Sequence, residues 1–259
     1  MATIAGRGSA TATALCRLLG GEVPAEALDI ALAGKLLGLA KKDDGTRVLA
    51  CGTIARRLVA RAACAVRKDK VIEVVTELQY GFVPSGVEAL HKSLSARSEE
   101  HPDMAYVSLD MYSAFTRMRR RDVLRCIRRL CPEFEPLFRQ WYARSAIHVA
   151  AGGASGSRLV SQNEGLDQGC PLSPAFFCMG LASPLTDFRD NLQQLDDRCK
   201  VWAYLDDIYF SVPKAMLDQA IRLATRLFGE VGLELNMAKT RVWCPDGDHL
   251  LVPVAHVHL

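Results

Sequence analysis

The sequence lacks any long apolar run that could cross a membrane. Its charge-free stretch from Gly169 to Thr186 contains three prolines, which fits a packed element of a folded domain better than a membrane span. Charged residues make up 24% of the 259 residues, the usual share for a folded protein, which excludes wholesale disorder. We therefore expect a soluble globular protein, one large domain or two small ones, with no membrane partner.

The sequence also lacks several motifs that would assign it to other classes. Its nine cysteines include no Cys-x-x-Cys pair, so neither a zinc site nor a disulfide framework is indicated, and an intracellular compartment, nuclear or cytoplasmic, is expected. The glycine-rich segment 152–157 has neither the Gly-Lys-Ser/Thr of a phosphate-binding loop nor the Gly-x-Ser-x-Gly of a nucleophile elbow. No Gly-x-Gly-x-x-Gly opens a helix, so a dinucleotide-binding fold is not expected.

Net charge is small, but it is unevenly distributed. The formal net charge is +3, whereas the segment from Arg117 to Arg144 carries nine arginines against three acids and sums to +6. Such a basic block can contact the phosphates of a nucleic acid. A solvated helix face is the alternative interpretation of the same charges.

Apolar periodicity predicts interleaved helices and strands without regular βαβ alternation, which indicates the α+β class. Ser85 and Glu88 form the sequence pattern of a capping box, and Asp44-Gly45 predicts a hairpin turn. Helices are expected over 24–39, 54–66, 85–97, 119–130, 135–144, 172–192 and 216–231. Strands are expected over 36–39, 47–50, 105–111, 146–151, 158–162, 200–212 and 240–244.

Three aspartates stand at the ends of these apolar strands. Asp110 closes one strand, and Asp206 and Asp207 interrupt the apolar run at the apex of the hairpin expected over 200–212. Neighbouring carboxylates in such a run are costly unless a cation compensates them, and both can face one metal ion only where the backbone turns. Carboxylates together with substrate phosphates are the ligands that Mg²⁺ prefers. An ordinary surface turn is the alternative for the Asp-Asp pair alone.

Six short motifs, in order, resemble those of reverse transcriptases. Tyr204-Leu205-Asp206-Asp207 resembles the YxDD box, and residues 110–115 resemble the first palm motif, in which an aspartate precedes an aromatic residue by five positions. The other four resemblances are the fingers hairpin at 41–47, a QxGF element at 79–82, a QGxPLSP motif at 168–174, and a GLxxN…KT motif at 232–240. The form of the motifs, over roughly residues 30 to 245, is most similar to non-LTR retrotransposon enzymes.

The resemblance implies roles in two-metal nucleotidyl transfer. Asp110 and Asp206 would hold two Mg²⁺ ions, for which Mn²⁺ could substitute, with Asp207 as a supporting acid. Phe115 would lie under the sugar of the incoming nucleotide and leave no room for a 2′-hydroxyl; a core aromatic is the alternative. Lys239 would neutralise or protonate the departing pyrophosphate.

The resemblance also implies a binding site for the incoming dNTP. Gln168 and Gly169 would lie against the nascent base pair. Arg47, with either Lys41 or Lys42, would grip the triphosphate, and the sequence leaves open which lysine does so. For any single lysine or arginine here, a solvated surface charge is the alternative.

The implied fold is the fingers–palm core of a right-hand polymerase, with an antiparallel palm sheet backed by helices. The expected layout is an N-terminal extension over 1–30, a fingers-like region over 31–104, a palm over 105–245 with part of the fingers inserted at about 117–165, and a tail over 246–259. The extension begins with twenty-one residues without an acid, weakly similar to a transit peptide, and is expected to be flexible in part.

The resemblance leaves three functional hypotheses. The first is an RNA-directed DNA polymerase that acts on dNTPs and an RNA or DNA template with its primer. The second is a truncated, inactive retroelement remnant that folds and binds nucleic acid, because no thumb is recognised. A thumb or endonuclease supplied by other chain segments is a further expected partner. The third is an RNA-templated RNA polymerase, against which Phe115 argues.

Overall fold

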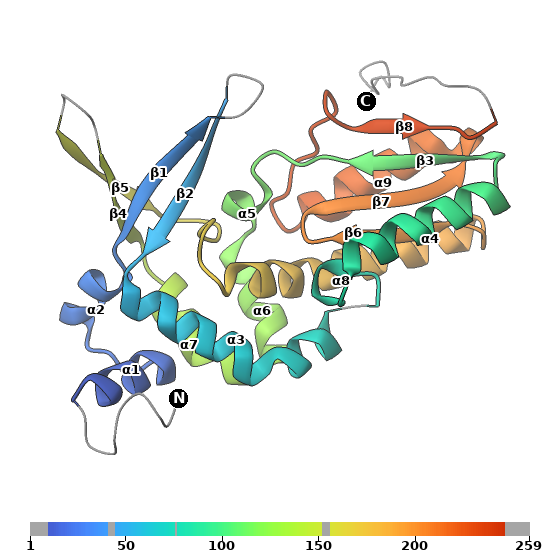
Figure 1. Ribbon diagram of the computed structural model, residues 1–259. Coiled ribbons are helices and arrows are strands. Elements are labelled where there is room, and N and C mark those ends of the chain that lie inside the picture. The colour runs from blue at the N-terminus through green and yellow to red at the C-terminus, as the bar shows by residue number, and fades with distance from the viewer. Residues whose placement is uncertain (1–9, 41–44, 76, 152–155, 247–259) are drawn as a thin grey trace. The chain divides into compact units, whose positions relative to one another are not determined.

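The chain folds into two compact units that each combine segments distant in sequence. Unit 1 consists of Met1–Val71 and Met118–Phe177, and unit 2 of Ile72–Arg117 and Cys178–Leu259. The computed structural model in Figure 1 describes residues 10–40, 45–75, 77–151 and 156–246. None of the helices in these residues is both long and apolar enough to span a membrane.

Unit 1 is built on a mixed four-stranded sheet with the order β2-β1-β4-β5. β1 is antiparallel to β2, with Gly34 opposite Gly52, and parallel to β4, with Gly34 beside His148; β4 and β5 form an antiparallel hairpin. The elements are α1 (Ala10–Gly20), α2 (Ala25–Leu32), β1 (Gly34–Ala40), β2 (Thr46–Gly52), most of α3 (Ile54–Val74), α6 (Arg120–Leu130), η2 (Pro132–Phe134), α7 (Glu135–Tyr142), β4 (Ala146–Ala151), β5 (Ser157–Gln162) and the first turn of α8 (Ser173–Leu195).

Unit 2 is built on an antiparallel four-stranded sheet with the order β6-β7-β3-β8. β3 is an interior strand, and five of its six residues are buried, which explains why its sequence is a continuous apolar run. The elements are η1 (Tyr80–Phe82), α4 (Gly86–Glu100), β3 (Met104–Leu109), α5 (Ala114–Arg117), the rest of α8, β6 (Lys200–Tyr204), β7 (Asp207–Pro213), η4 (Lys214–Met216), α9 (Leu217–Gly229) and β8 (Arg241–Trp243).

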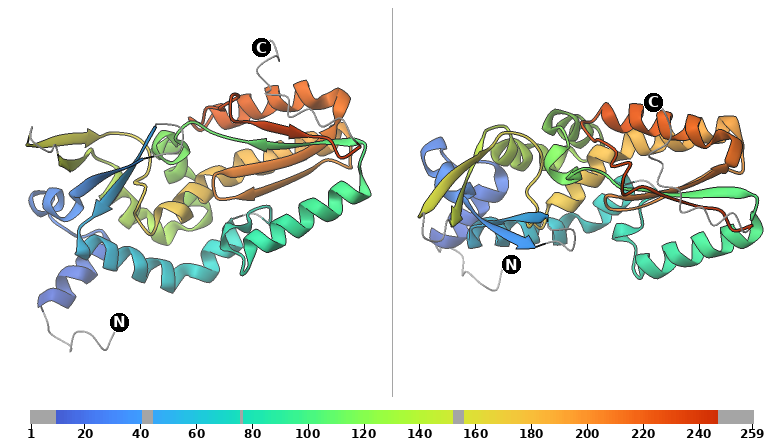
Figure 2. Two further views of the ribbon diagram at one scale, coloured as in Figure 1. Left: turned by 45° about the horizontal axis from the view of Figure 1, so that its top comes forward. Right: turned by 90° about the horizontal axis from the view of Figure 1, so that it is seen from above.

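Aromatic side chains form much of each core. In unit 2, Phe188 of α8 packs edge-on against Phe210 of β7 and against Phe228 of α9, and all three are fully buried. On the other face of this sheet, Trp202 of β6 donates a hydrogen bond to Ser93 of α4 (2.8 Å). Figure 2 shows the same arrangement, with α8 and α9 on one face of the sheet and α4 on the other.

The α+β class is confirmed, as are the expected hairpins over β4–β5 and β6–β7. Two local expectations are wrong. The helix expected to reach Leu39 ends at Leu32, because the chain turns at Ala33 and enters β1. Ser85 makes no capping hydrogen bond, because its backbone is left-handed (φ 51°), whereas a capping side chain requires the extended backbone usual at that position.

The division into fingers and palm stays a prediction. The inserted segment expected at about 117–165 corresponds to residues 118–177 of unit 1. Residues 72–104, which the sequence analysis assigned to the fingers-like region, lie in unit 2 together with β3 and the β6–β7 hairpin. Residues 41–44, where most of the hairpin turn is expected, and the tail from residue 247 lie outside the described residues.

A buried ion pair joins distant segments of unit 1. Arg56 of α3 lies 2.5 Å from Asp167, and the two side chains are only 3% and 1% exposed. Arg56 also donates to the carbonyl of Leu32 (3.2 Å), and a ring nitrogen of His148 lies 3.4 Å from Asp167. Burial alone would raise the pKa of the Asp167 carboxyl, but the neighbouring His148 imidazole and the Arg56 charge together hold it below its ordinary value.

We predict that Arg56→Met lowers the free energy of unfolding by about 3–5 kcal/mol, because it leaves Asp167 as an unpaired buried charge. The lowered pKa of Asp167 means that the stabilisation is present above the ordinary carboxyl pKa and is lost as the pH falls through the folded-state value. The deficit of the variant should therefore shrink in acid. Urea denaturation at several pH values measures both effects.

The exposed neighbour Arg57 provides the matched control. Arg57→Met should change the stability by no more than about 0.5 kcal/mol. Replacing both partners, Arg56→Met with Asp167→Leu, should recover most of the loss, since no buried charge then remains. Equal losses for the Arg56 and Arg57 variants would contradict the structural role of the pair.

Candidate functional site

Asp110 and Asp207 end neighbouring strands at the same edge of the unit 2 sheet. In the β3–β7 pair, Leu109 lies opposite Ile208. Asp110 follows Leu109 and Asp207 precedes Ile208, so the antiparallel register brings the two aspartates to adjacent positions. The hairpin register also pairs Tyr204 with Asp207, which leaves Leu205 and Asp206 as the two residues of the turn.

The turn depends on a left-handed backbone at Leu205. Its φ is 56°, a conformation that costs a residue with a side chain roughly 1–2 kcal/mol. Consecutive side chains of a strand point to opposite faces of the sheet. Because the chain reverses here, Asp206 lies in the turn and does not follow that alternation. The backbone turn that the sequence predicts beside the two acids is therefore present.

The three carboxylates lie within electrostatic reach of one another. Partial burial raises the pKa of Asp207, and the negative charges of Asp206 and Asp110 raise it further. Asp206 lies close enough to α8 that its charge adds to the effect of burial in raising the pKa of the Cys178 thiol. This edge of the sheet therefore accumulates negative charge that a cation would relieve.

The segment after α9 supports Asp110 from the side opposite the hairpin. The Asn236 amide donates to the carbonyl of Asp110 (2.8 Å), and the Asp110 amide approaches the hydroxyl of buried Thr240 (3.4 Å). The amide of Lys239 donates to the carbonyl of Asn236 (3.0 Å), so exposed Lys239 belongs to the same turn as Thr240. The GLxxN…KT motif thus places its Asn and Thr against Asp110, contacts that sequence reasoning did not assign.

Phe115 follows Asp110 on a short helix of the same unit. α5 begins after Ser113, whose backbone is left-handed (φ 48°), and Phe115 is half-buried. Arg117 at the end of α5 forms an ion pair with Glu234, which anchors the helix to the segment beside Asp110. The short helix that carries Phe115 is therefore linked to the segment that contacts Asp110.

Apart from Phe115, the predicted dNTP contacts that the structure describes belong to unit 1. The Ala50 amide of β2, the strand that carries exposed Arg47, donates to the carbonyl of Gln168 (2.6 Å). Gly169 has φ 113°, and a Cβ there would lie 2.9 Å from the carbonyl oxygen of Ala50. The glycine is therefore required by close contact with β2, whereas sequence reasoning assigned it to approach of a ligand. Lys41 and Lys42 lie outside the described residues.

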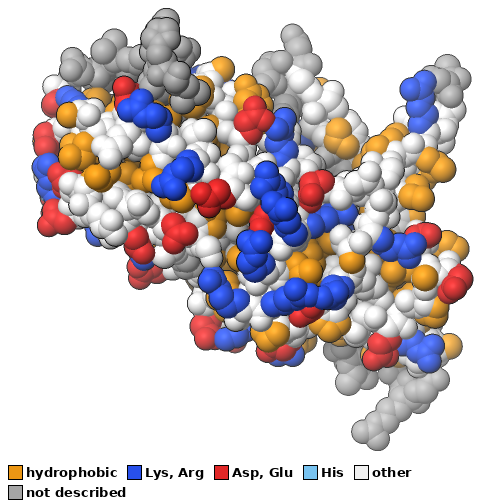
Figure 3. Space-filling model, turned by 180° about the vertical axis from the view of Figure 1, so that it is seen from behind, with side chains coloured by type: hydrophobic (Ala, Val, Ile, Leu, Met, Phe, Trp, Pro, Cys, Tyr) orange, Lys and Arg blue, Asp and Glu red, His pale blue; other side chains and the backbone are white. Residues whose placement is uncertain are grey.

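The arginines between 117 and 144 are extensively paired. Buried Arg120 donates to the carbonyls of Gly165 (2.8 Å) and Arg144 (3.0 Å), which makes it a structural group. Further ion pairs in this block join Arg121 and Arg125 to Asp122, Arg128 and Arg139 to Glu135, and Arg144 to Asp29. On the face drawn in Figure 3, Lys and Arg side chains lie among Asp and Glu side chains. A phosphate-binding role for the block stays a prediction.

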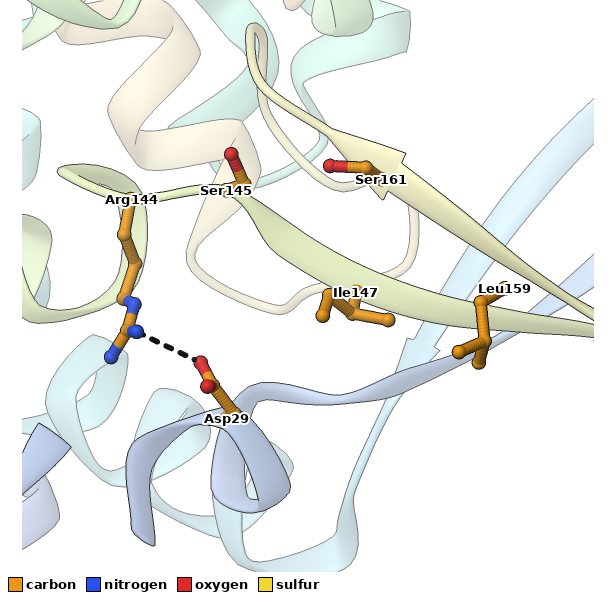
Figure 4. A pocket seen from close by; sticks show the side chains of 6 residues that line it. All are labelled: Asp29, Arg144, Ser145, Ile147, Leu159 and Ser161. Carbon is orange, nitrogen blue, oxygen red and sulfur yellow. Dashed lines mark ion pairs between the residues drawn. The ribbon is translucent and has the colours of Figure 1, made fainter. Parts of the chain in front are cut away.

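A pocket of about 410 Å³ lies in unit 1 between α2 and the β4–β5 hairpin (Figure 4). Arg144 reaches across to Asp29 (3.2 Å), and Ile147 and Leu159 provide apolar walls. The lining contains none of the residues singled out from the sequence motifs. The three clustered aspartates belong to unit 2, so the pocket is not their site.

The acid cluster fits a divalent cation in its donor chemistry. Its members are oxygen donors, as Mg²⁺ and Mn²⁺ prefer, and their repulsion raises the pKa of Asp207. Among the described residues, however, no three His, Cys, Asp or Glu side chains are gathered closely enough to form a ready-made metal site. The three carboxylates therefore supply the donor type of a metal site but not a finished ligand set.

We predict that Asp207→Asn raises the melting temperature at neutral pH, because it removes one of three repelling charges. A raised carboxyl pKa destabilises the fold above that pKa, and the penalty disappears as the pH falls below the ordinary carboxyl value. The gain should therefore vanish in acid, and Mg²⁺ should stabilise the wild type more than the variant. Differential scanning fluorimetry across pH provides the measurement.

Asp103→Asn is the control, because Asp103 is an exposed acid of the same unit paired with Arg198 (3.1 Å). Its removal should give no stabilisation at neutral pH. An Asp207→Asn variant that is no more stable than the wild type would show that the acids do not repel one another.

Comparison with solved structures gives matches at the level of the fold. A telomerase from Candida albicans, in complex with a TWJ fragment of telomeric RNA, matches with a TM-score of 0.66 and 12% identity over 85% of this chain and 44% of that one. The apo telomerase from Candida tropicalis matches with a TM-score of 0.66 and 11% identity over 88% and 46%. This chain thus spans less than half the length of either telomerase. A comparison with curated proteins gave no match.

A family model, described as reverse transcriptase (RNA-dependent DNA polymerase), matches residues 39–253. The matched region contains the β1–β2 hairpin from Leu39 onward, the Gln168-Gly169 turn and the edge where the aspartates gather. Since it covers well over half of the sequence, the chain belongs to the reverse transcriptase (RNA-dependent DNA polymerase) family.

Proposed function

We propose that this chain is the fingers–palm part of an RNA-directed DNA polymerase from a non-LTR type retroelement. The reaction is attack of a primer 3′-hydroxyl on the α-phosphate of a dNTP, which forms the new phosphodiester bond and releases pyrophosphate. The observation that carries the proposal is the gathering of Asp110, Asp206 and Asp207 at one sheet edge in a member of this family.

The acids are the groups that hold the ions and orient the reaction. Enzymes of this family generally use divalent metal ions. Asp110 and Asp206 would hold two Mg²⁺ ions, or Mn²⁺ in their place, and Asp207 would support them. When bound, such ions stabilise the charge that develops on the attacking and leaving oxygens. Lys239 is the candidate for neutralising or protonating the departing pyrophosphate.

The other substrate contacts follow from the motif positions. Phe115 would lie under the deoxyribose, Gln168 and Gly169 against the nascent base pair, and Arg47 with Lys41 or Lys42 on the triphosphate. The template would be RNA or DNA with a paired primer; one of the matching telomerases is described in complex with RNA. A thumb or endonuclease would come from other segments, and the location would be intracellular, nuclear or cytoplasmic.

We predict that the purified chain incorporates dTTP on poly(rA)–oligo(dT) with Mg²⁺ or Mn²⁺. Asp110→Ala or Asp206→Ala should lower the rate by more than about 100-fold. Loss of a group that only orients a metal ligand costs up to about 100-fold, and these two carboxylates would be the ligands themselves. Primer extension resolved on a denaturing gel measures the rate. Asp103→Asn, on the same unit, should retain full activity.

The variants should first be shown to unfold cooperatively, so that a lost rate is not lost structure. A folded wild type without incorporation would favour an inactive retroelement remnant. Incorporation that survives Asp206→Ala would mean that the catalytic site lies elsewhere.

Phe115 provides a separate test of substrate selection. Phe115→Ala should leave dTTP incorporation within about 10-fold of the wild type but admit UTP, because the ring no longer fills the space that a 2′-hydroxyl would occupy. The measured quantity is the ratio of kcat/KM for dTTP and UTP. An unchanged ratio would mean that Phe115 is a core aromatic residue and does not select the sugar.

A further inference from the structure

Both ends of the Gln79 side-chain amide bind Leu205, in the turn that carries Asp206. Its Oε1 accepts hydrogen bonds from the amides of Leu205 (2.6 Å) and Gly81 (3.2 Å). Its Nε2 donates to the carbonyl of Leu205 (3.3 Å). The residue is only 4% exposed. Both polar groups of Leu205, which is in the turn and outside the sheet ladder, are therefore bound by one side chain.

The backbone around Gln79 holds this amide at a fixed place. The amide of Ala203 donates to the carbonyl of Leu78 (2.8 Å), and Gln79 forms a parallel bridge with Ala203. The segment thus runs alongside the last residues of β6 until the hairpin turns. All of these groups belong to unit 2.

Gly81 completes the fit around Leu205. A Cβ at position 81 would lie 2.6 Å from Cδ2 of Leu205 and 3.2 Å from Oε1 of Gln79. Any larger side chain at 81 would therefore push on the Leu205 side chain or on the amide that binds it. The QxGF element supplies two of its residues, the glutamine and the glycine, to the turn.

We propose that Gln79 is a positioning residue that holds Leu205 in its left-handed conformation and thereby sets the direction of the Asp206 carboxylate toward the bound cation. The left-handed backbone is unfavourable for leucine, so the turn needs an external restraint. Hydrogen bonds to both sides of one residue restrain its φ and ψ more tightly than a single bond. The catalytic consequence rests on the proposed polymerase function.

Gln79→Met is the informative variant, because methionine keeps the length and apolar contacts of glutamine but cannot make the three hydrogen bonds. We expect kcat for primer extension to fall about 10–100-fold, the range found for groups that orient a metal ligand. The affinity for Mn²⁺, measured by EPR on the protein without nucleic acid, should fall about 10-fold. In the same variant, hydrogen exchange of the Leu205 amide, followed by NMR, should accelerate at least about 10-fold.

Ser93→Ala is the matched control. It removes a side-chain hydrogen bond to Trp202 of β6, in the same unit, but does not touch the turn. It should lower thermal stability while leaving Mn²⁺ affinity, kcat and Leu205 exchange at their wild-type values. A merely structural role for Gln79 would give the same pattern in the Gln79→Met variant.

Each readout can overturn a different part of the proposal. Unchanged Leu205 exchange in Gln79→Met would show that the glutamine does not restrain the turn. Faster exchange with unchanged Mn²⁺ affinity would show that the restraint does not set the direction of Asp206. A wild type that binds Mn²⁺ but does not polymerise would contradict the proposed function while leaving Gln79 to be judged on exchange and ion binding. A wild type that does not bind Mn²⁺ would overturn both.

Gly81→Ala tests the same restraint without removing a hydrogen-bonding group. The added methyl group must shift the Leu205 side chain within the turn, so Mn²⁺ affinity should fall as it does in Gln79→Met. This variant decides the question if Gln79→Met fails to fold. Wild-type Mn²⁺ affinity in a folded Gly81→Ala protein would contradict the proposal.

Discussion

The carboxylates of Asp110, Asp206 and Asp207 carry like charges at the ends of neighbouring strands and repel one another. Much of unit 2 serves to hold these three groups together despite that repulsion. Asp110 and Asp207 meet because β3 and β7 are in antiparallel register, and Asp206 joins them because the chain reverses at Leu205. The cost is visible in the raised pKa of Asp207. The fold overcomes this repulsion with apolar packing of α8 and α9 on the sheet and with backbone hydrogen bonds from Asn236.

In unit 1 the buried charges are of opposite sign and attract each other. Arg56 and Asp167 are of opposite sign, almost fully buried, and tie α3 to the residue that immediately precedes the Gln168-Gly169 turn. Gly169 then approaches Ala50 so closely that no side chain is tolerated. The conformation of this turn is therefore fixed by an ion pair on one side and by a backbone contact on the other.

Much of this could be predicted from local patterns. The β6–β7 hairpin was predictable because Asp206-Asp207 interrupts an apolar run, and α6 because its apolar residues recur at helical spacing. The left-handed backbones of Leu205 and Ser85 were not predictable, since neither residue type favours that conformation. Contacts such as Gln79 with Leu205 join residues 126 positions apart, and no local pattern encodes them. The roles of the site residues remain predictions from motif resemblance.

The two units are interlaced along the chain, and this has a consequence for how the molecule forms. Unit 1 takes its second segment from the middle of the sequence, and unit 2 from both sides of that segment. The sheets accordingly pair distant strands: Gly34 of β1 lies beside His148 of β4, and Tyr106 of β3 lies opposite Trp243 of β8. Closing such long loops costs chain entropy before any contact compensates for it, which slows folding. During synthesis the unit 1 sheet cannot be completed before β5 has left the ribosome, nor the unit 2 sheet before β8 has, so Asp110 waits for β7 and β8 to emerge before its neighbours are in place.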